Sequence, residues 1–432
     1  MKEQSKNQTI SGITRRDFVK SSAVGIAALA AGASRMYAQG SDKIRIAVIG
    51  CGGRGTYDTT NCLNAAEGVE LVAMGDLFKD RLDNARQTLT KNLPDKVKVT
   101  DEKCFVGWDA YKKVVQLDDV DMVILTTPPH FRHIHIAAAI NAGKHVFAEK
   151  PVAVDPAGVR SVIASSELAD QKGLTFVAGT QMRRIAHLVA GMQKIHDGAI
   201  GEVVSGQCVR IGGGMMGWGS EPQPGWSEME WQLRRWLFVT WLSGDFIAEM
   251  HVHNLDLVNW AMGAHPVQCI GMGGRQVRTA QKYGNVYDHI TVEYEYPNGV
   301  RVEYMGAQID KVTVRNDQWF VGTKGRAYMD FANTIIKGAN PFTYDGPSPS
   351  PVLRQHADQI EAIRKSKRLN EGRRIAESSL TAIIGRMSAY TGRALKWDWA
   401  LKASKLDLSP EKYEFGDLEL RPVAIPGQTQ LI

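Results

Sequence analysis

The chain has 432 residues, of which 44% are hydrophobic and 23% are charged, close to the averages of soluble globular proteins. This balance argues against a disordered chain, a collagen-like chain and a polytopic membrane protein. The length predicts two domains, or three, each able to bury a sizeable core. The formal net charge is +6, from 52 Lys and Arg against 46 Asp and Glu.

The positive charge is concentrated at the N-terminus. Residues 1–38 hold six basic and two acidic residues, so the rest of the chain has 46 basic against 44 acidic residues and a net charge of +2. A body so close to neutral lacks the basic surface that nucleic-acid binding requires. We therefore predict no nucleic-acid partner.

An export signal is predicted over residues 1–38. The sequence Thr-Arg-Arg-Asp-Phe-Val-Lys at 14–20 precedes an uncharged stretch of 14 residues at 21–34, rich in Ala and Gly. This stretch is shorter than the roughly 20 residues that span a bilayer, and its order of basic, apolar and small residues is typical of a removable signal. It closely resembles the twin-arginine signal, which implies a periplasmic location with no stable membrane insertion. Cleavage after Ala33 or Ala38 both fit, and an interfacial or disordered N-terminal helix is the alternative.

The sequence contains five cysteines: Cys51, Cys62, Cys104, Cys208 and Cys269. Their number is odd and none forms a C-x-x-C pair, so the sequence predicts neither a disulfide framework nor a zinc site. We expect reduced, structural cysteines.

A dinucleotide-binding unit follows the signal. Residues 44–49 are apolar at nearly every position, as in a buried parallel strand, and Gly50-Cys51-Gly52-Gly53-Arg54-Gly55 follows with the pattern G-x-G-x-x-G. The glycines permit a tight turn, a close approach of the pyrophosphate and close packing of helix on strand. A second strand at 69–75 ends in Asp76, 21 residues after Gly55, where an acid would bind the ribose of NAD. The carboxylate favours NAD over NADP, although Lys79 and Arg81 lie close by.

Strands and helices continue to alternate up to residue 178. Strands at 121–127, 145–148 and 174–178 alternate with helices at 130–142 and 156–172, which predicts a doubly wound parallel sheet, a Rossmann domain, over 39–178. Ligands bind beyond the carboxyl ends of such strands. The predicted cofactor-binding residues are Gly50, Gly52, Gly53, Arg54, Gly55, Asp76, Thr127, Pro128, His130, Glu149 and Lys150.

A second domain of α+β type is predicted over 179–432. Strands at 203–211, 290–296 and 300–304, the last two joined by Pro297-Asn298-Gly299, indicate a largely antiparallel open sheet. Residues 355–390 are predicted to be helical.

One polar stripe stands out in this domain. Glu249, His253, Asp256 and Trp260 recur at helical spacing, so a helix over 244–260 would present them on one face. A carboxylate and a histidine on a largely buried helix form a candidate acid–base pair. In an extended segment Glu249, His251 and His253 would share a side and could hold a metal, but the spacing favours the helix and we predict no metal.

The combination of G-x-G-x-x-G, Glu149-Lys150-Pro151 at a strand end and the carboxylate-x-x-x-His-x-x-Asp helix resembles the Gfo/Idh/MocA oxidoreductases, named for glucose–fructose oxidoreductase and inositol dehydrogenase. The resemblance extends to residues 322–325 and 383–392. It implies that Lys150 and His253 act on the hydroxyl being oxidised, His253 as general base and Lys150 by stabilising charge on oxygen. Glu249 stands where many members have aspartate, and His251 where many have a small residue, which leaves the identity of the base open.

The resemblance also implies a sugar, glycoside or cyclitol as substrate and a homo-oligomer. Lys150, Arg183, His253 and Asp256 are the predicted substrate-binding residues. Five tryptophans within 24 residues (Trp218, Trp226, Trp231, Trp236 and Trp241) would suit the apolar face of a sugar, or a core or subunit interface.

The resulting functional hypothesis is an NAD(P)-dependent oxidoreductase that acts on a ring hydroxyl. Because free NAD is scarce outside the cytoplasm, we expect a tightly bound, internally recycled cofactor. One alternative is a glycosidase that oxidises the ring transiently, eliminates the aglycone and reduces the ring again. Another is a non-catalytic sugar-sensing protein, which would need no Lys150–His253 pair.

Overall fold

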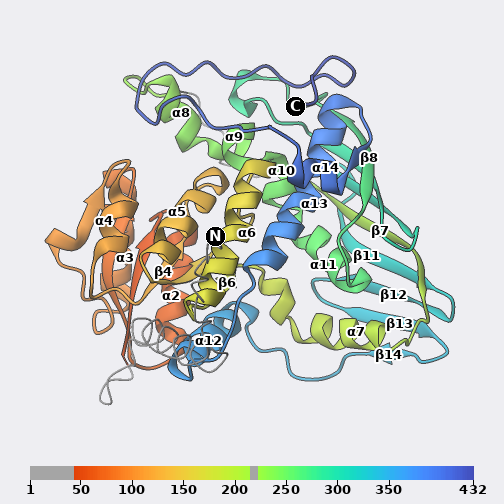
Figure 1. The fold of residues 1–432 in the computed structure, drawn as a ribbon, viewed down its shortest axis with the longest axis horizontal. Coiled ribbons are helices and arrows are strands. Elements are labelled where there is room, and N and C mark those ends of the chain that lie inside the picture. Colours follow the sequence, from red (N-terminus) through yellow and green to blue (C-terminus); the bar gives the residue numbers. More distant parts are fainter. Residues whose placement is uncertain (1–42, 215–221) are drawn as a thin grey trace, which may run out of the picture. The chain divides into compact units, whose positions relative to one another are not determined.

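The N-terminal part of the protein is built on a six-stranded parallel sheet (Figure 1). The computed structural model describes residues 43–214 and 222–432, so the predicted export signal and Trp218 lie outside the described residues. The strand order is β3-β2-β1-β4-β5-β6, and it changes direction between β1 and β4, beside the Gly-rich loop. The strands are β1 (Ile44–Ile49), β2 (Val69–Asp76), β3 (Cys104–Val106), β4 (Met122–Leu125), β5 (His145–Ala148) and β6 (Phe176–Ala178).

Helices cover both faces of this sheet. Alternate side chains of β1 enter separate cores: Ile46 and Val48 pack on one face, and Ala47 and Ile49 on the other. The first face carries α2 (Gly53–Ala65), α3 (Lys79–Asn92) and, from the C-terminal part of the chain, α12 (Pro351–Arg364). The second carries α4 (Ala110–Gln116), α5 (Pro129–Asn141) and α6 (Pro156–Gln171). The predicted Rossmann architecture is confirmed.

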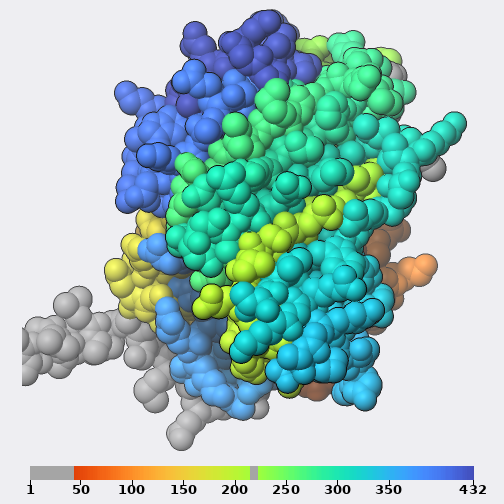
Figure 2. Space-filling view, turned by 90° about the vertical axis from the view of Figure 1, so that its right-hand side faces the viewer, coloured from red at the N-terminus to blue at the C-terminus, as the bar shows by residue number. Residues whose placement is uncertain are grey.

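The C-terminal part of the protein is built on a nine-stranded sheet. Its strand order is β14-β13-β12-β11-β7-β10-β9-β8-β15. All pairs are antiparallel except β7 with β10, and the predicted turn at Asn298-Gly299 joins β9 to β10. Figure 2 shows one face of this sheet, with β7 (yellow-green) crossing it diagonally. The strands are β7 (Val203–Gly212), β8 (Gln268–Gly274), β9 (His289–Glu295), β10 (Arg301–Gln308), β11 (Arg315–Gly322), β12 (Gly325–Asp330), β13 (Thr334–Gly338), β14 (Phe342–Thr343) and β15 (Leu395–Lys396).

The remaining helices pack on this sheet or join the two layers. They are α7 (Ala186–His196), α8 (Glu228–Arg234), α9 (Thr240–Ser243), α10 (Asp245–Glu249), α11 (Val252–Met262), α13 (Gly372–Thr391) and α14 (Trp397–Lys402), with short 3₁₀ turns η1 (Asp101–Lys103), η2 (Gln181–Arg184), η3 (Trp236–Phe238) and η4 (Gln281–Tyr283). Helix α13 is buried on nearly every side because it packs against α6 of the Rossmann part and against α11 and β8. It therefore connects the two sheets.

The predicted helical stretch at 355–390 is interrupted. Residues 365–371 separate α12 from α13 because they run along the edge strand β6, where Phe176 N donates to Leu369 O and Glu371 N donates to Phe176 O. Pairing with a sheet edge over these residues competes with helical hydrogen bonds.

Two further findings concern the sequence predictions. All five cysteines are free thiols, and four of them are buried. Across residues 43–214 and 222–432, no helix combines the length and the hydropathy needed to cross a bilayer.

Candidate active site

The Gly-rich loop between β1 and α2 has the shape that a pyrophosphate needs. Gly50 has φ +98°, and a Cβ there would lie 2.6 Å from the Thr127 backbone nitrogen. A Cβ on Gly55 would lie 1.9 Å from Gly50 O, so this glycine permits the close packing of α2 on the strand. Over Gly52, by contrast, a Cβ would meet no atom within 4 Å. Open space therefore lies at the N-terminus of α2, whose backbone N–H groups favour an anion.

A cavity of about 540 Å³ continues from this loop. Gly50, Gly52 and Asp76 line it, together with Thr127 and Pro128 from the loop after β4. Asp76 accepts hydrogen bonds from Cys51 N (2.5 Å) and Phe78 N (2.8 Å), and burial raises the pKa of its carboxyl group. A carboxylate fixed at the end of β2 is placed to accept from a ribose hydroxyl. The cavity thus fits the adenosine and pyrophosphate half of a dinucleotide.

Six predicted cofactor residues do not line this cavity: Gly53, Arg54, Gly55, His130, Glu149 and Lys150. His130 is fully buried, and its Nε2 lies 2.8 Å from the Tyr413 hydroxyl. Glu149 is buried in the space that Gly179 leaves without a side chain. Its carboxylate accepts from Arg54 and from the Lys150 backbone nitrogen, so it connects the Gly-rich loop to the neighbouring lysine.

Lys150 and Glu249 meet where the two parts of the chain join. The Lys150 ammonium donates to Glu249 O (2.6 Å) and to Glu249 Oε1 (3.2 Å). Both side chains are nearly buried. Burial lowers the pKa of Lys150, although the negative charges of Glu249 and Glu149 oppose this shift. The strand-end lysine and the helix carboxylate, both predicted site residues, therefore form an ion pair with each other.

The predicted helix over 244–260 is broken at its centre. Helix α10 ends at Glu249 and α11 begins at Val252, and between them His251 N donates to Phe246 O, five residues back instead of four. Arg210 from β7 stabilises the break, because its guanidinium donates to Met250 O and to Asn254 Oδ1. His253 thus stands in the first turn of α11.

His253 is buried, and within residues 43–214 and 222–432 its Nδ1 has no hydrogen-bond partner. Burial, and then the positive charges of Lys150 and Arg210, lower the pKa of its imidazole well below 6.5. The ring is therefore neutral at physiological pH. A neutral, unpartnered imidazole nitrogen beside an ammonium group can accept a proton from a hydroxyl that the ammonium group polarises.

His251 has a different environment from His253. Its Nδ1 lies 2.6 Å from the hydroxyl of Tyr304 on β10, and both side chains are buried. Since the segment is helical, the extended arrangement that would let Glu249, His251 and His253 share one metal does not occur. Within the described ranges, no group of three or more potential ligands is arranged to hold a metal ion.

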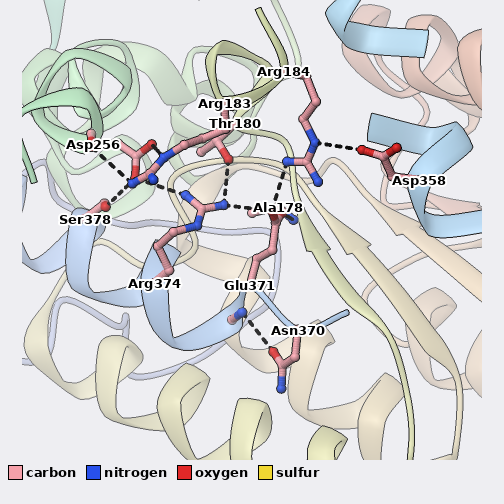
Figure 3. A network of polar contacts seen from close by, with 11 residues as sticks. Ala178, Thr180, Arg183, Arg184, Asp256, Asp358, Asn370, Glu371, Arg374 and Ser378 are labelled. Atoms are coloured by element: carbon pink, nitrogen blue, oxygen red, sulfur yellow. Dashed lines mark hydrogen bonds and ion pairs between the residues drawn. The ribbon is translucent and has the colours of Figure 1, made fainter. Parts of the chain in front are cut away.

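Arg183 and Asp256 bind each other (Figure 3). Two nitrogens of Arg183 reach the Asp256 carboxylate at 2.7 and 3.0 Å, and the same carboxylate accepts from Arg374 and Ser378. The two arginines hold the pKa of Asp256 well below its usual range despite burial. Arg183 also lies 4.3 Å from the ring of Trp260, so the predicted face of α11 is formed by His253, Asp256 and Trp260. The network fixes α11 against η2 and α13, and it occupies Arg183 and Asp256, two of the four predicted substrate-binding residues.

Sequence reasoning did not identify two buried arginines near the site. Arg210 shares a strand face with the buried Cys208, and this period of two was the available signal. Arg132 on α5 donates to Pro151 O at 2.7 Å, and burial lowers its pKa to about 10. A single arginine among the histidines and apolar residues of α5 gives no distinct pattern in the sequence.

The described tryptophans have separate environments. Trp231 and Trp241 are buried, and the Trp241 indole donates to Gln232 Oε1. Trp236 lines the 540 Å³ cavity, and Trp226 lies beside the Arg234 guanidinium. The described tryptophans therefore contribute to the core and to the wall of the cavity more than to an exposed surface on which a sugar could stack.

Sequence comparisons agree with this geometry. Residues 44–180 match the family described as "Oxidoreductase family, NAD-binding Rossmann fold", and residues 190–328 match the "GFO/IDH/MocA C-terminal domain". The 2,7-anhydro-N-acetylneuraminate hydratase of Escherichia coli is 26% identical over 51% of this chain and 55% of its own length. Glycosyl hydrolase family 109 protein 2 of Shewanella sp. (strain ANA-3) is 28% identical over 47% of each chain. The chain thus spans about half the length of the curated relatives it matches.

The fold is also found among solved structures. The aldose-aldose oxidoreductase of Caulobacter crescentus superposes with a TM-score of 0.64 at 20% identity, over 82% of this chain and 99% of that one. Both halves of the chain, with their Gly-rich loop, strand-end Lys150 and helix α11, match the two domains of one family. The chain belongs to the Gfo/Idh/MocA family of NAD-binding oxidoreductases.

Proposed function

We propose that the protein oxidises a ring hydroxyl of a sugar, glycoside or cyclitol where Lys150, Glu249 and His253 meet. The observation that carries this proposal is the buried Nδ1 of His253, which has no hydrogen-bond partner among the described residues and belongs to an imidazole whose pKa the positive charge of Lys150 helps to lower. A buried polar atom without a partner costs stability unless a ligand satisfies it. A substrate hydroxyl is the partner that this nitrogen and this ammonium group can share.

The proton chemistry follows from the charges at the site. Lys150 donates a hydrogen bond to the substrate oxygen and stabilises the negative charge that develops there. Neutral His253 takes the hydroxyl proton, and Glu249 holds Lys150 in place through its carbonyl and its carboxylate. When bound, NAD supplies the acceptor for the hydride that leaves the same carbon. Arg183 and Asp256, which bind each other, support this site by fixing the orientation of α11.

A second function uses the same residues. Oxidation of a ring hydroxyl acidifies the neighbouring C–H, so an aglycone can be eliminated. Water then adds to the double bond that elimination leaves, and the ring ketone is reduced again. Similarity to glycosyl hydrolase family 109 protein 2 and to an anhydro-sugar hydratase favours this reading of the site. The two functions differ in their products: a dehydrogenase leaves a keto-sugar, and the redox glycosidase releases an aglycone without net NADH.

The test is a panel of sugars and glycosides monitored for keto-sugar, aglycone and NADH. We expect Lys150→Met and His253→Gln to lower turnover by about 100-fold or more while NAD still binds. Lys337→Met, an exposed lysine on β13, is the control and should turn over normally. Full turnover in both site variants would exclude the proposed roles, whereas a native protein that binds NAD and turns over no member of the panel would favour a sugar-sensing protein.

A periplasmic location of the protein is part of the same proposal. A periplasmic enzyme would meet little free NAD, so its cofactor stays bound and is reset in the same site or by a second substrate. Replacing Arg15 and Arg16 by lysine should hold the protein in the cytoplasm, as judged by cell fractionation. Dinucleotide should copurify with the native protein, detected by absorbance and mass; an empty site with millimolar affinity would contradict a retained cofactor.

A further inference from the structure

A segment outside both family matches contributes to the dinucleotide cavity. The matched regions end at residue 328, whereas residues 407–420, here named the C-terminal strap, lie near the end of the chain. The strap contains no helix or strand, but it is held at several points along its length. Leu408 N donates to Asp155, Met229 N on α8 donates to Gly416 O at 3.1 Å, and Gln232 Nε2 donates to Leu418 O at 2.7 Å. In Figure 1 the dark-blue C-terminal chain runs past α8.

The strap brings one aromatic ring, Tyr413, into the lining of the cavity and a second, Phe415, against aromatic residues of that lining. Tyr413 lines the same cavity as Gly50, Gly52 and Asp76, and its ring centroid lies 6.0 Å from that of Trp108. Phe415 lies 5.4 Å from the Trp108 ring and 5.9 Å from that of Phe78. Trp108 and Phe78 belong to the loops after β3 and β2, so residues some 300 positions apart in sequence form one aromatic wall.

These rings are only partly covered by the protein. Tyr413 is 37% and Phe415 is 47% exposed, which is unusual for clustered aromatic side chains beside a cavity. Arg234 on α8 adds a cation to the same wall, since its guanidinium lies 4.0 Å from the Phe78 ring and binds Asp80. An aromatic wall of this kind fits a flat, π-rich group such as a purine.

The direction of the cavity identifies which end of a dinucleotide meets this wall. Asp76 at the end of β2 faces the position of the adenosine ribose, and Phe78 and Trp108 lie beyond it, toward β3. Lys150 and His253 are absent from the lining of the cavity, so the reacting end lies elsewhere. The wall therefore belongs to the adenine end.

We propose that the C-terminal strap binds the adenine end of NAD through Tyr413 and Phe415 and retains the cofactor. This inference rests on the proposed NAD-dependent function. The hydrogen bond between the Tyr413 hydroxyl and His130 Nε2 holds the strap closed, and burial lowers the pKa of His130 to about 3, so this contact is between two neutral groups. Release of NAD requires the strap to move away from α8 and α5, and the cofactor stays bound between turnovers.

The test uses point variants of the full chain, because a truncated chain would also lose contacts that the strap makes with the core. Affinity and dissociation rate are measured for NAD and for ADP, which keeps the adenosine end and lacks the nicotinamide. We expect Tyr413→Ala to weaken both ligands by the same factor, about tenfold or more, as loss of a stacking ring does. Tyr413→Phe, which keeps the ring and loses only the hydroxyl, should have an effect of about two- to tenfold. Lys412→Ala, an exposed neighbour on the strap, is the matched control and should bind as the native protein does.

Each outcome has a defined meaning. If Tyr413→Ala and Tyr413→Phe released NAD and ADP no faster than Lys412→Ala does, the role of the strap would be overturned. The proposed oxidoreductase function would remain intact. Weaker binding of NAD but not of ADP would also overturn it, because the wall would then not serve the adenine end. Failure of the native protein to bind NAD at all would overturn both proposals.

Discussion

The buried His253 has a ring nitrogen without a hydrogen-bond partner among the described residues, a feature that it shares with the buried His130 and His356. Burial and two neighbouring cations lower the pKa of its imidazole, so the neutral form persists well into the acidic range. A base must be neutral to accept a proton, and the lowered pKa extends the pH range in which His253 can do so. The cost is a weaker base, which the positive charge of Lys150 on the substrate oxygen offsets.

This protonation state predicts the pH dependence of oxidation. The pKa of His253 lies below 6.5, so the acid limb of kcat/KM should have its midpoint below pH 6.5. Above that midpoint the base is neutral, and the rate should not fall again on account of His253. His253→Gln should remove the limb along with most of the rate, whereas His289→Gln, on a partly exposed surface histidine, should preserve it. An acid limb centred at or above pH 6.5 in the native protein would contradict this assignment.

Alanine substitutions at two glycines of the loop after β1 should affect different properties, one the stability of the protein and the other its affinity for NAD. Gly55→Ala would place a methyl group 1.9 Å from Gly50 O, so we expect a loss of stability of about 1–3 kcal/mol or more. Gly52→Ala meets no protein atom within 4 Å, so stability should be unchanged. Its methyl group would instead occupy the approach of the pyrophosphate, and NAD affinity should fall about tenfold or more.

Urea unfolding and NAD titration of the two variants separate these effects. A Gly52→Ala protein that binds NAD normally would show that the pyrophosphate does not approach this residue.

At the scale of elements, helix α11 depends on partners from distant parts of the chain. Arg210 of β7 holds its N-terminal end, and Asp256 at its centre is bound by Arg183 and by Arg374 of α13. Figure 3 shows how this network continues through Glu371 to Arg184. The position of His253 in the site is therefore set by three elements that are not adjacent to it in sequence.

Removing the centre of this network should destabilise the protein. Asp256→Ala removes the carboxylate that the largely buried Arg183 binds and one of the two carboxylates that Arg374 binds, so we expect a loss of about 3–5 kcal/mol. Asp398→Ala removes an exposed pair with Lys402 and should have no measurable effect. Urea unfolding gives both values, and an equal effect in the two variants would contradict the structural role of the network.

The same network predicts a pH effect on stability. The folded-state pKa of Asp256 is below the ordinary value of 3.8, so its contribution is complete above that pH and is lost as the pH falls through the lowered pKa.

Features that depend on the spacing of residues close together in the chain could be predicted from the sequence. The glycines of the loop, Asp76 after β2, and the shared face of His253, Asp256 and Trp260 were predicted from patterns within about 30 residues. The break between α10 and α11 was not predicted, because Arg210 stabilises it from 40 residues away. Tyr413 was missed for the same reason, since its partner His130 is 283 residues away. Contacts of that range leave no periodicity in either segment.

At the scale of the whole molecule, the outer face of the nine-stranded sheet carries apolar side chains that the chain does not cover. Met272 on β8 and Met305 on β10 are 56% and 44% exposed, and both are in register with Thr291 on β9 between them. Figure 2 shows this sheet from one side, where β7 to β13 form a continuous surface. Exposed apolar side chains in one row across three strands are typical of an interface.

We therefore expect a homo-oligomer that uses this face. Met272→Glu combined with Met305→Glu should lower the molar mass measured by light scattering after size-exclusion chromatography. Val314→Glu, at a residue 73% exposed outside any strand, is the control and should not change the mass. A native protein that elutes as a monomer at micromolar concentration would contradict this prediction.

The buried carboxylate of Glu149 has one further consequence. It is shared between Arg54 of the Gly-rich loop and the backbone of Lys150, so the loop that receives the pyrophosphate and the residue that receives the substrate oxygen are joined by a single side chain. Any displacement of Arg54 on dinucleotide binding alters the support of Lys150, and the resulting coupling free energy acts equally in both directions. A sugar bound at Lys150 would then change the affinity for NAD by the same factor by which NAD changes the affinity for the sugar.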